Sequence, residues 1–428
     1  MGGRGAVRPA RAWIPLALAV LASLGACKTL ERLPAEPPAL STGALPEAAG
    51  CIPPNPSPQA SPDAAPQAGA CRYFVARETA SFVAEARAAA ARGRAWHAQN
   101  GVPIPPLNML AVSGGGDDGA FGAGLLVGWT EAGTRPEFQV VTGISTGALI
   151  APFAFLGSSR DGDLRSVYTE INQHDIFTSR SFLAALTSDA MADTKPLRQM
   201  LEQHVDQALL DQIGAEYAKG RLLLVGTTDL DSREPVIWNM TAIAASHSPN
   251  ALSLFRKVLL ASASIPGAFP PVMIDVEVNG ARYQEMHVDG GATTQVFVYP
   301  PTLRIAEEAA AAGIERQRSL YVIRNASLDP DWTVVKRGTL PIAGRAVSSL
   351  MAAQGIGDLY RIYLLAERDD IDFNLAYIPA SFSAPKKGQF DQAYMRALFQ
   401  EGHDLAARGY PWEKHPPGYT RAIKEAAH

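Results

Sequence analysis

Residues 138–151 read FQVVTGISTGALIA and contain the most informative pattern of this sequence. An apolar, strand-like run is followed by Ser145, which stands between Gly143 and Gly147 at the start of a helix-forming run. A turn this tight strains its central residue, exposes that residue's hydroxyl and requires small neighbours on both sides. The free N–H groups of the helix N-terminus would stabilise negative charge beside the serine. The pattern predicts a nucleophile elbow at Ser145, with a plain turn serine as the alternative when it is taken alone.

Short apolar runs alternate with helix-forming stretches on both sides of this elbow. Such alternation predicts an α/β fold with a sheet buried on both faces. The expected strands are Leu107–Val112, Phe138–Val141, Arg221–Val225, Glu234–Met240, Tyr283–Val288 and Ser319–Ile323.

A glycine-rich loop, SGGGDDGAFGAG at residues 113–124, directly follows the first of these strands. Consecutive N–H groups that no Cβ atom shields can converge on the oxyanion formed in acyl transfer. We therefore expect the backbone of Gly114, Gly115 and Gly116 to form an oxyanion hole.

The same loop also matches the G-x-G-x-x-G pattern of dinucleotide-binding proteins. The only acidic residue at about the right distance, Glu137, precedes the second strand instead of ending it, so it would not reach a ribose. Asp117 and Asp118 would also oppose a pyrophosphate. We therefore expect no nucleotide here and no other cofactor.

A third segment, Val288-Asp289-Gly290-Gly291, ends a strand-like run. An Asp-Gly-Gly sequence is usually a turn. A serine hydroxyl, however, needs a base within hydrogen-bond reach, and a carboxylate at an adjacent strand end can act as one. Because an ordinary carboxyl pKa near 4 makes a poor base, the site would have to exclude solvent.

These three blocks occur in the order and at the strand ends found in the patatin-like phospholipases, which the sequence resembles. A fourth block, ASASIPGAFPP at residues 261–271, resembles the segment of that family before the aspartate. The resemblance is good over residues 107–300. It implies a three-layer α/β/α sandwich with a mostly parallel central sheet, and a Ser145–Asp289 dyad without a catalytic histidine. The implied substrate is a lipid or other acyl ester, cleaved through an acyl-serine intermediate as in phospholipases A, lysophospholipases and esterases.

One position departs from the family pattern. Members usually carry Arg or Lys where this sequence has Asp118, a difference of two charge units. The backbone donors stay intact, so the departure bears on the preference for anionic headgroups more than on hydrolysis.

Two other functions remain open from the sequence. A Ser-His-Asp lipase or esterase could use His287, His403 or His415. A catalytically silent lipoprotein could instead use the fold to bind lipid or a protein partner. No cluster of His, Cys, Asp and Glu has metal-ligand spacing, so we expect no metal.

The N-terminus indicates export. Three arginines precede the apolar stretch Trp13–Ala26, which is too short to span a bilayer comfortably and is typical of a secretory signal. Residues 24–27, LGAC, resemble a bacterial lipobox, which implies a diacylated Cys27 as the mature N-terminus. An ordinary signal with an incidental cysteine is the alternative. Because Lys28 is not Asp, we expect an exported bacterial lipoprotein on the outer membrane rather than the inner one.

The expected organisation is a signal peptide (1–26), a lipidated Pro/Ala-rich tether (27–70), a helical extension (71–106, with a helix from Cys71 to about Gln99) and a hydrolase domain (107–428). Cys51 and Cys71 would be exported, so a disulfide between them is expected, with two free thiols as the alternative. The net charge of -4 and the dispersed charges exclude electrostatic binding of nucleic acid. Protein partners are not indicated.

Overall fold

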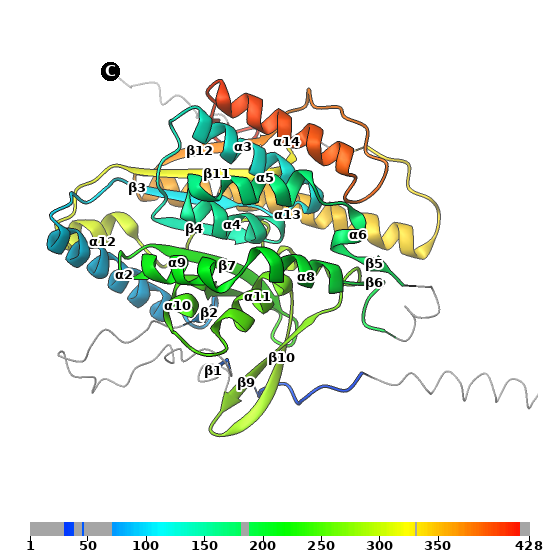
Figure 1. Ribbon diagram of the computed structural model, residues 1–428, viewed down its shortest axis with the longest axis horizontal. Coiled ribbons are helices and arrows are strands. Elements are labelled where there is room, and N and C mark those ends of the chain that lie inside the picture. The colour runs from blue at the N-terminus through cyan, green and yellow to red at the C-terminus, as the bar shows by residue number, and fades with distance from the viewer. Residues whose placement is uncertain (1–29, 38–44, 47–70, 181–187, 330–331, 420–428) are drawn as a thin grey trace, which may run out of the picture.

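The structure is a computed structural model that describes residues 30–37, 45–46, 71–180, 188–329 and 332–419 (Figure 1). The predicted signal peptide, the lipid-attachment residue Cys27 and most of the predicted tether lie outside these residues. Among the helices of the described residues, none is long and apolar enough to cross a membrane.

A ten-stranded sheet runs through the molecule in the order β1-β9-β10-β7-β4-β3-β11-β12; in addition, β8 pairs with β7, and β2 pairs with β8. Its central strands are parallel: β3 (Leu107–Val112), β4 (Val140–Ile144), β7 (Leu222–Asp229), β11 (Arg318–Ser327) and β12 (Asp372–Ile378). The remaining strands pair antiparallel: β1 (Leu45–Pro46), β2 (Arg72–Phe74), β8 (Glu234–Asn239), β9 (Val272–Val278) and β10 (Ala281–Asp289). A separate pair joins β5 (Thr178–Ser179) and β6 (Ala192–Asp193).

Helices cover both faces of the parallel strands, giving three layers (Figure 1). One face carries α3 (Gly119–Glu131), α4 (Thr146–Leu156), α5 (Asp161–Thr169), α8 (Lys195–His204), α9 (Gln207–Tyr217), α10 (Met240–Ala245), α11 (Ala251–Ser262) and α14 (Gln392–Ala407). The other face carries α2 (Thr79–Asn100), α12 (Ile305–Ala311) and α13 (Thr339–Arg368). The short helix α6 spans Gln173–Ile176, and 3₁₀ turns span Gly116–Asp118, Ser158–Arg160 and Gly290–Ala292.

Strand β3 shows why the central strands are apolar throughout. Leu110 and Val112 belong to the core on one face of the sheet, whereas Met109 and Ala111 belong to the core on the other. Successive side chains alternate between two buried faces, so both must be apolar. The predicted α/β class with a mostly parallel central sheet is confirmed.

The predicted helix from Cys71 is wrong at its start. Residues Arg72–Phe74 form a strand that pairs with β8, and the helix begins only at Thr79. All three residues of this strand are buried, so both of its faces are covered. An amphipathic helix would leave one face exposed. Cys71 is buried and disulfide-bonded. Cys51 lies outside the described residues, so its pairing with Cys71 stays a prediction.

Part of the predicted tether lies against the body. Arg32 forms an ion pair with Asp231 at 2.7 Å. The Leu33 N–H donates to the Gln284 side chain at 3.0 Å, and the Gln284 N–H donates to the carbonyl oxygen of Pro34 at 3.0 Å. Residues 30–37 therefore run along β10, a contact that proline-rich composition alone does not reveal.

Candidate active site

Ser145 lies at the expected strand-to-helix turn, between β4 and α4. Its backbone has φ 55° and ψ −125°, the strained conformation of a nucleophile elbow. A Cβ on Gly143 would overlap the Gly147 carbonyl oxygen, and a Cβ on Gly147 would overlap the carbonyl oxygen of Val112. Both glycines are therefore required by close backbone approach. The position at the N-terminus of α4 places free helix N–H groups beside the serine.

The alanine- and serine-rich block holds this turn in place. The Ser145 N–H donates to Ser262 Oγ at 3.0 Å, and the Ser262 hydroxyl donates to the Gly226 carbonyl oxygen at 2.7 Å. The elbow of β4 is thus tied to the end of α11 and to β7. This contact gives the fourth sequence block a structural role.

Asp289 ends β10 and hydrogen-bonds to the Ser145 side chain. Strand β8 pairs with one edge of β7, and both β4 and β10 pair with the other edge. Strand β10 runs antiparallel to β7, with Asp289 opposite Thr227. Gly226, which precedes Thr227 in β7, pairs with Ile144, the last residue of β4. The end of β4 and the end of β10 therefore meet on the same edge of β7, which places Ser145 and Asp289 at adjacent strand ends.

The electrostatic environment of Asp289 suits a base. The residue is 2% exposed, and burial raises the pKa of its carboxyl to about 7. Hydrogen bonds from Ser145 and from the Gly291 N–H, at 2.7 Å, oppose this rise because they favour the ionised form. The carboxylate is consequently a far stronger base than one in water.

The glycine loop lies beside the serine, and a Cβ on Gly114 would be 3.2 Å from Ser145 Cβ. The Gly114 N–H, however, donates to the Gln295 carbonyl oxygen at 3.1 Å. The expectation that Gly114 donates to an oxyanion is thus corrected, since its N–H is already occupied. The N–H groups of Gly115 and Gly116 have no backbone acceptor among the described residues. Thr146, the first residue of α4, adds an N–H without an intrahelical acceptor.

The acidic pair of the loop is held by the C-terminal part of the chain. Lys386 Nζ donates to Asp117 at 2.7 Å and to Asp118 at 3.3 Å, and the Tyr394 hydroxyl donates to Asp118 at 2.8 Å. Burial, as the largest effect, raises the pKa of Asp118, and Lys386 opposes this. Lys386 therefore brings one positive charge to the loop, against the two charge units by which Asp118 departs from the family pattern.

Sequence reasoning missed two residues that order the loops. The Asn325 side chain accepts from the Gly122 N–H at 3.1 Å and donates to the Ser113 carbonyl oxygen at 2.9 Å. Gln295 accepts the Gly114 N–H with its carbonyl oxygen and donates from its side chain to the Gly291 carbonyl oxygen at 2.7 Å. Gln295 thus links the glycine loop to the aspartate loop. Neither residue belongs to a motif, so no local signal pointed to them.

The histidines are engaged elsewhere. His287 is fully buried, with Nδ1 2.9 Å from Thr227 Oγ1 and Nε2 2.9 Å from Glu285 Oε2. His403 pairs with Glu131, at the far end of α3 from the glycine loop, and His415 stacks on Tyr419. The described residues therefore show no histidine positioned as a base for Ser145. They also contain no group of three or more His, Cys, Asp or Glu that could hold a metal ion.

Comparisons with known proteins bear on this arrangement. The model of the family described as patatin-like phospholipase matches residues 110–300. A search of curated proteins finds no match. Among solved structures, the chain is similar to VipD from Legionella pneumophila at 13% identity and a TM-score of 0.31, covering 72% of this chain and 67% of VipD. Human GIVD cytosolic phospholipase A2 is similar at 10% identity and a TM-score of 0.32, covering 74% of this chain.

The chain spans about two thirds of VipD and about half of the human enzyme, at 67% and 55% of their lengths. The family match includes the glycine loop, the elbow and the Asp289 loop. Residues 110–300 therefore match a patatin-like phospholipase domain, and this match supports lipid acyl hydrolase activity.

Proposed function

We propose that the chain is a serine acyl hydrolase that uses Ser145 as nucleophile and Asp289 as base. The hydrogen bond between these two side chains, in a buried site that raises the Asp289 pKa to about 7, is the observation that carries the proposal. In the first step Ser145 Oγ bonds to the acyl carbonyl carbon, and its proton passes to the Asp289 carboxylate. The resulting oxyanion would accept hydrogen bonds from Gly115 and Gly116.

Collapse of this intermediate breaks the bond to the leaving alcohol, which takes the proton from Asp289. Water then attacks the carbonyl carbon of the acyl-serine and gives a proton to Asp289. The bond to Ser145 Oγ breaks, Oγ takes this proton back from Asp289, and the carboxylic acid leaves. A carboxyl pKa near 7 suits both directions of transfer, since the group can accept and return a proton near neutral pH.

We further propose that the enzyme acts at a membrane surface through residues 332–351. Large apolar side chains are concentrated there: Trp332 is 85% exposed, Val334 76%, Leu340 68% and Leu350 70%. Residues 332–357 contain no Asp or Glu but include Lys336, Arg337 and Arg345. An exposed apolar surface with cations and a tryptophan fits an anionic lipid interface.

This surface is connected to the proposed catalytic residues. Gln354 of α13 donates to the carbonyl oxygen of Thr293, just after the aspartate loop, and Met351 packs near Gly291. Figure 1 shows the first half of α13 projecting from the body of the molecule. A bilayer contacted by this half-helix would therefore lie close to Ser145.

The catalytic proposal is tested by labelling with a fluorophosphonate, which reacts with activated serines. The wild-type chain should be labelled, Ser145→Ala should not, and Asp289→Asn should react much more slowly. Retained labelling in a folded Ser145→Ala variant would contradict the assignment. Loss of labelling in His287→Ala, with the fold intact, would favour the triad alternative.

The surface proposal has a separate test, flotation with vesicles containing anionic phospholipid. Leu340→Asp with Ile342→Asp should reduce vesicle binding and leave hydrolysis of a short-chain, water-soluble ester unchanged. Val102→Asp, at another exposed apolar residue, is the control and should bind normally. Equal binding of all three proteins would show that residues 332–351 do not contact the membrane.

A further inference from the structure

A cavity lies at the N-terminal ends of the central parallel strands, whereas Ser145 lies at their C-terminal ends. It has a volume of about 470 Å³ and lies between α2 and α12, over Leu107 of β3 and Leu222 of β7. Each of these two residues is the first of its strand. Val140, which also lines the cavity, is the first residue of β4, whereas Ser145 follows the last residue of β4. The length of β4, about 16 Å at 3.3 Å per residue, therefore separates this cavity from the proposed catalytic serine.

Small side chains keep the cavity open. The wall from α2 includes Ala86, Ala89, Ala90 and Gly93, and the wall from α12 includes Ala309. The alanine runs look like ordinary helix-forming sequence, but at these positions they leave the space between two helices unfilled. The volume is within the range of about 300–1,000 Å³ typical of small-molecule sites, and the lining is mainly apolar, as in such sites.

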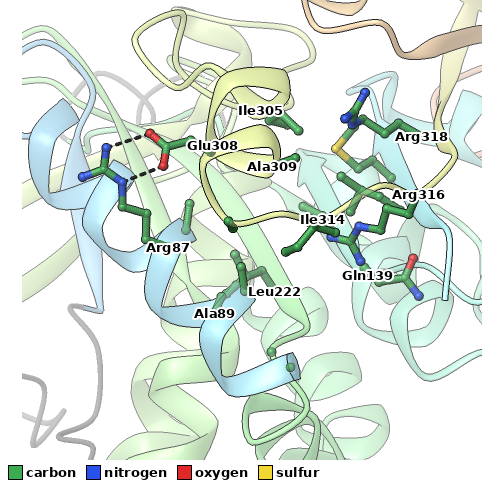
Figure 2. Close-up of a pocket in the computed structure, with 18 of the residues that line it drawn as sticks. Arg87, Ala89, Gln139, Leu222, Ile305, Glu308, Ala309, Ile314, Arg316 and Arg318 are labelled. Atoms are coloured by element: carbon green, nitrogen blue, oxygen red, sulfur yellow. Dashed lines mark hydrogen bonds and ion pairs between the residues drawn. The ribbon is translucent and has the colours of Figure 1, made fainter. Parts of the chain in front are cut away.

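The charged groups of the lining are strongly unbalanced. Its cations are Arg87, Arg94, Lys219, Arg316 and Arg318, whereas Glu308 is its only carboxylate. Arg87 and Glu308 neutralise each other in a two-pronged ion pair with both distances 2.7 Å. Figure 2 shows this pair on one side of the cavity and Arg316, Arg318 and Gln139 on the other.

Arg316 has no carboxylate partner among the described residues; its guanidinium donates only to the Pro105 carbonyl oxygen, at 3.4 Å. Arg318 approaches the fully exposed Asp370 at 4.0 Å. Burial, followed by the neighbouring charge of Arg318, lowers the pKa of Arg316. An anion beside these two guanidinium groups would relieve their repulsion. Nδ1 of His97, on the α2 wall, is also buried without a hydrogen-bond partner in the described structure.

We propose that this cavity binds a long-chain fatty acid, with its carboxylate at Arg316 and Arg318 and its acyl chain between α2 and α12. A single chain with a compact anionic head fits an apolar lumen that has a cationic end. A choline headgroup fits less well, because its ammonium would add another cation beside the arginines. Binding does not depend on the catalytic proposal. Only the idea that the acid is a product of Ser145 rests on the proposed function.

The test uses the full chain carrying Ser145→Ala, so that a failure of the hydrolase proposal does not affect it. Fluorescence of cis-parinaric acid, a polyunsaturated fatty acid, should show saturable binding that palmitate displaces. Ala309→Phe, which fills the cavity, should weaken binding by about tenfold or more. Ala310→Phe is the matched control, since Ala310 is exposed on the same helix and does not line the cavity. It should bind like the parent.

The headgroup assignment has its own pair of variants. Arg316→Gln should weaken parinarate binding by about tenfold, because a charge-assisted contact is lost. Arg304→Gln, at an exposed cation outside the cavity, should change nothing. Absence of saturable binding, or equal binding by Ala309→Phe and Ala310→Phe in folded protein, would overturn the proposal. Displacement by lysophosphatidylcholine as strong as that by palmitate would refute the carboxylate assignment.

Discussion

Two carboxylates on β10 are equally buried but have opposite electrostatics. Asp289 and Glu285 are both 2% exposed. Glu285 is in contact with Arg72 and His287, and Arg72 chiefly holds its pKa down at about 2 against the effect of burial. Asp289 has no cation among the causes of its shift, and burial raises its pKa to about 7. Burial alone therefore does not make a strong base. A cation beside a buried carboxylate keeps its pKa low, so the carboxylate stays ionised and is a weak base.

The neighbours of Glu285 extend this difference. Arg72 also lies over the Trp238 ring, 5.6 Å from its centroid, and burial beside Glu285 raises the pKa of Glu36 to about 8. The middle of β10 thus contacts the N-terminal segment through a hydrogen bond between Glu36 and the ion-paired Glu285, whereas the end of β10 keeps an uncompensated carboxyl next to Ser145. Within β10, the structural carboxylate Glu285 and the proposed catalytic base Asp289 are four residues apart.

The largest expected effect is that of Asp289→Asn on turnover. Removal of the base should reduce kcat for a p-nitrophenyl ester by about 10²–10⁴-fold, the usual contribution of general base catalysis. The folded fraction, measured by circular dichroism, should not fall. A variant with near-normal kcat would show that another group accepts the Ser145 proton.

Glu285→Gln should have the opposite pattern of effects, a loss of stability with little change in kcat. This substitution breaks a buried ion pair and removes the carboxylate that stabilises Arg72 most, so the free energy of unfolding should fall by about 3–5 kcal/mol. The kcat of the remaining folded protein should stay within a few-fold of the wild type. Urea unfolding combined with active-site titration separates the two effects. A large loss of kcat with unchanged stability would mean that Glu285 belongs to the catalytic site.

The pH dependence should differ between the two carboxyls. Asp289 must be ionised to act as a base, so kcat/KM should rise with pH through about 7. Its folded pKa exceeds the ordinary 3.8, so ionisation of Asp289 destabilises the fold increasingly as pH rises from 3.8 to about 7, and the effect is constant above that. Asp289→Asn should therefore gain Tm over the wild type at pH 8 and not at pH 4.

The contribution of Glu285 to stability depends on pH in the opposite direction. Its folded pKa, about 2, is below the ordinary 4.5, so its stabilising contribution is complete above pH 4.5 and is lost as pH falls toward 2. The difference in Tm between the wild type and Glu285→Gln should accordingly shrink in acid. A constant difference from pH 7 to pH 3 would contradict the depressed pKa.

The smallest expected effect concerns Lys386 at the glycine loop. Lys386→Met leaves Asp117 and Asp118 without their cation, so hydrolysis of an anionic phospholipid should fall by a few-fold relative to a neutral ester. Lys387→Met, at the next residue, is a control because no ion pair of Lys387 is found among the described residues. Equal ratios of the two activities in both variants would show that Lys386 does not influence headgroup preference.

Much of the fold and of the proposed site could be predicted from local sequence. The strand Leu107–Val112 has the predicted bounds, and the elbow at Ser145 has the predicted strand-turn-helix form. Both signals are local, because apolar runs and closely spaced glycines record burial and backbone contact directly. The start of the helix at Thr79 was mispredicted, because the strand Arg72–Phe74 exists only through its pairing with β8, far along the chain.

The sequence by itself determined the α/β class, the elbow, the candidate base and the family, since each depends on residue types at short spacing. Only the tertiary structure decided that the Gly114 N–H is hydrogen-bonded to Gln295, that Lys386 forms an ion pair with Asp118, and that Asp289, unlike Glu285, has no cation beside it. It also decided that two alanine-rich helices leave a cavity between them. The reason is physical: hydrogen-bond partners, charge compensation and unfilled volume depend on residues that are distant in the chain and become neighbours only after folding.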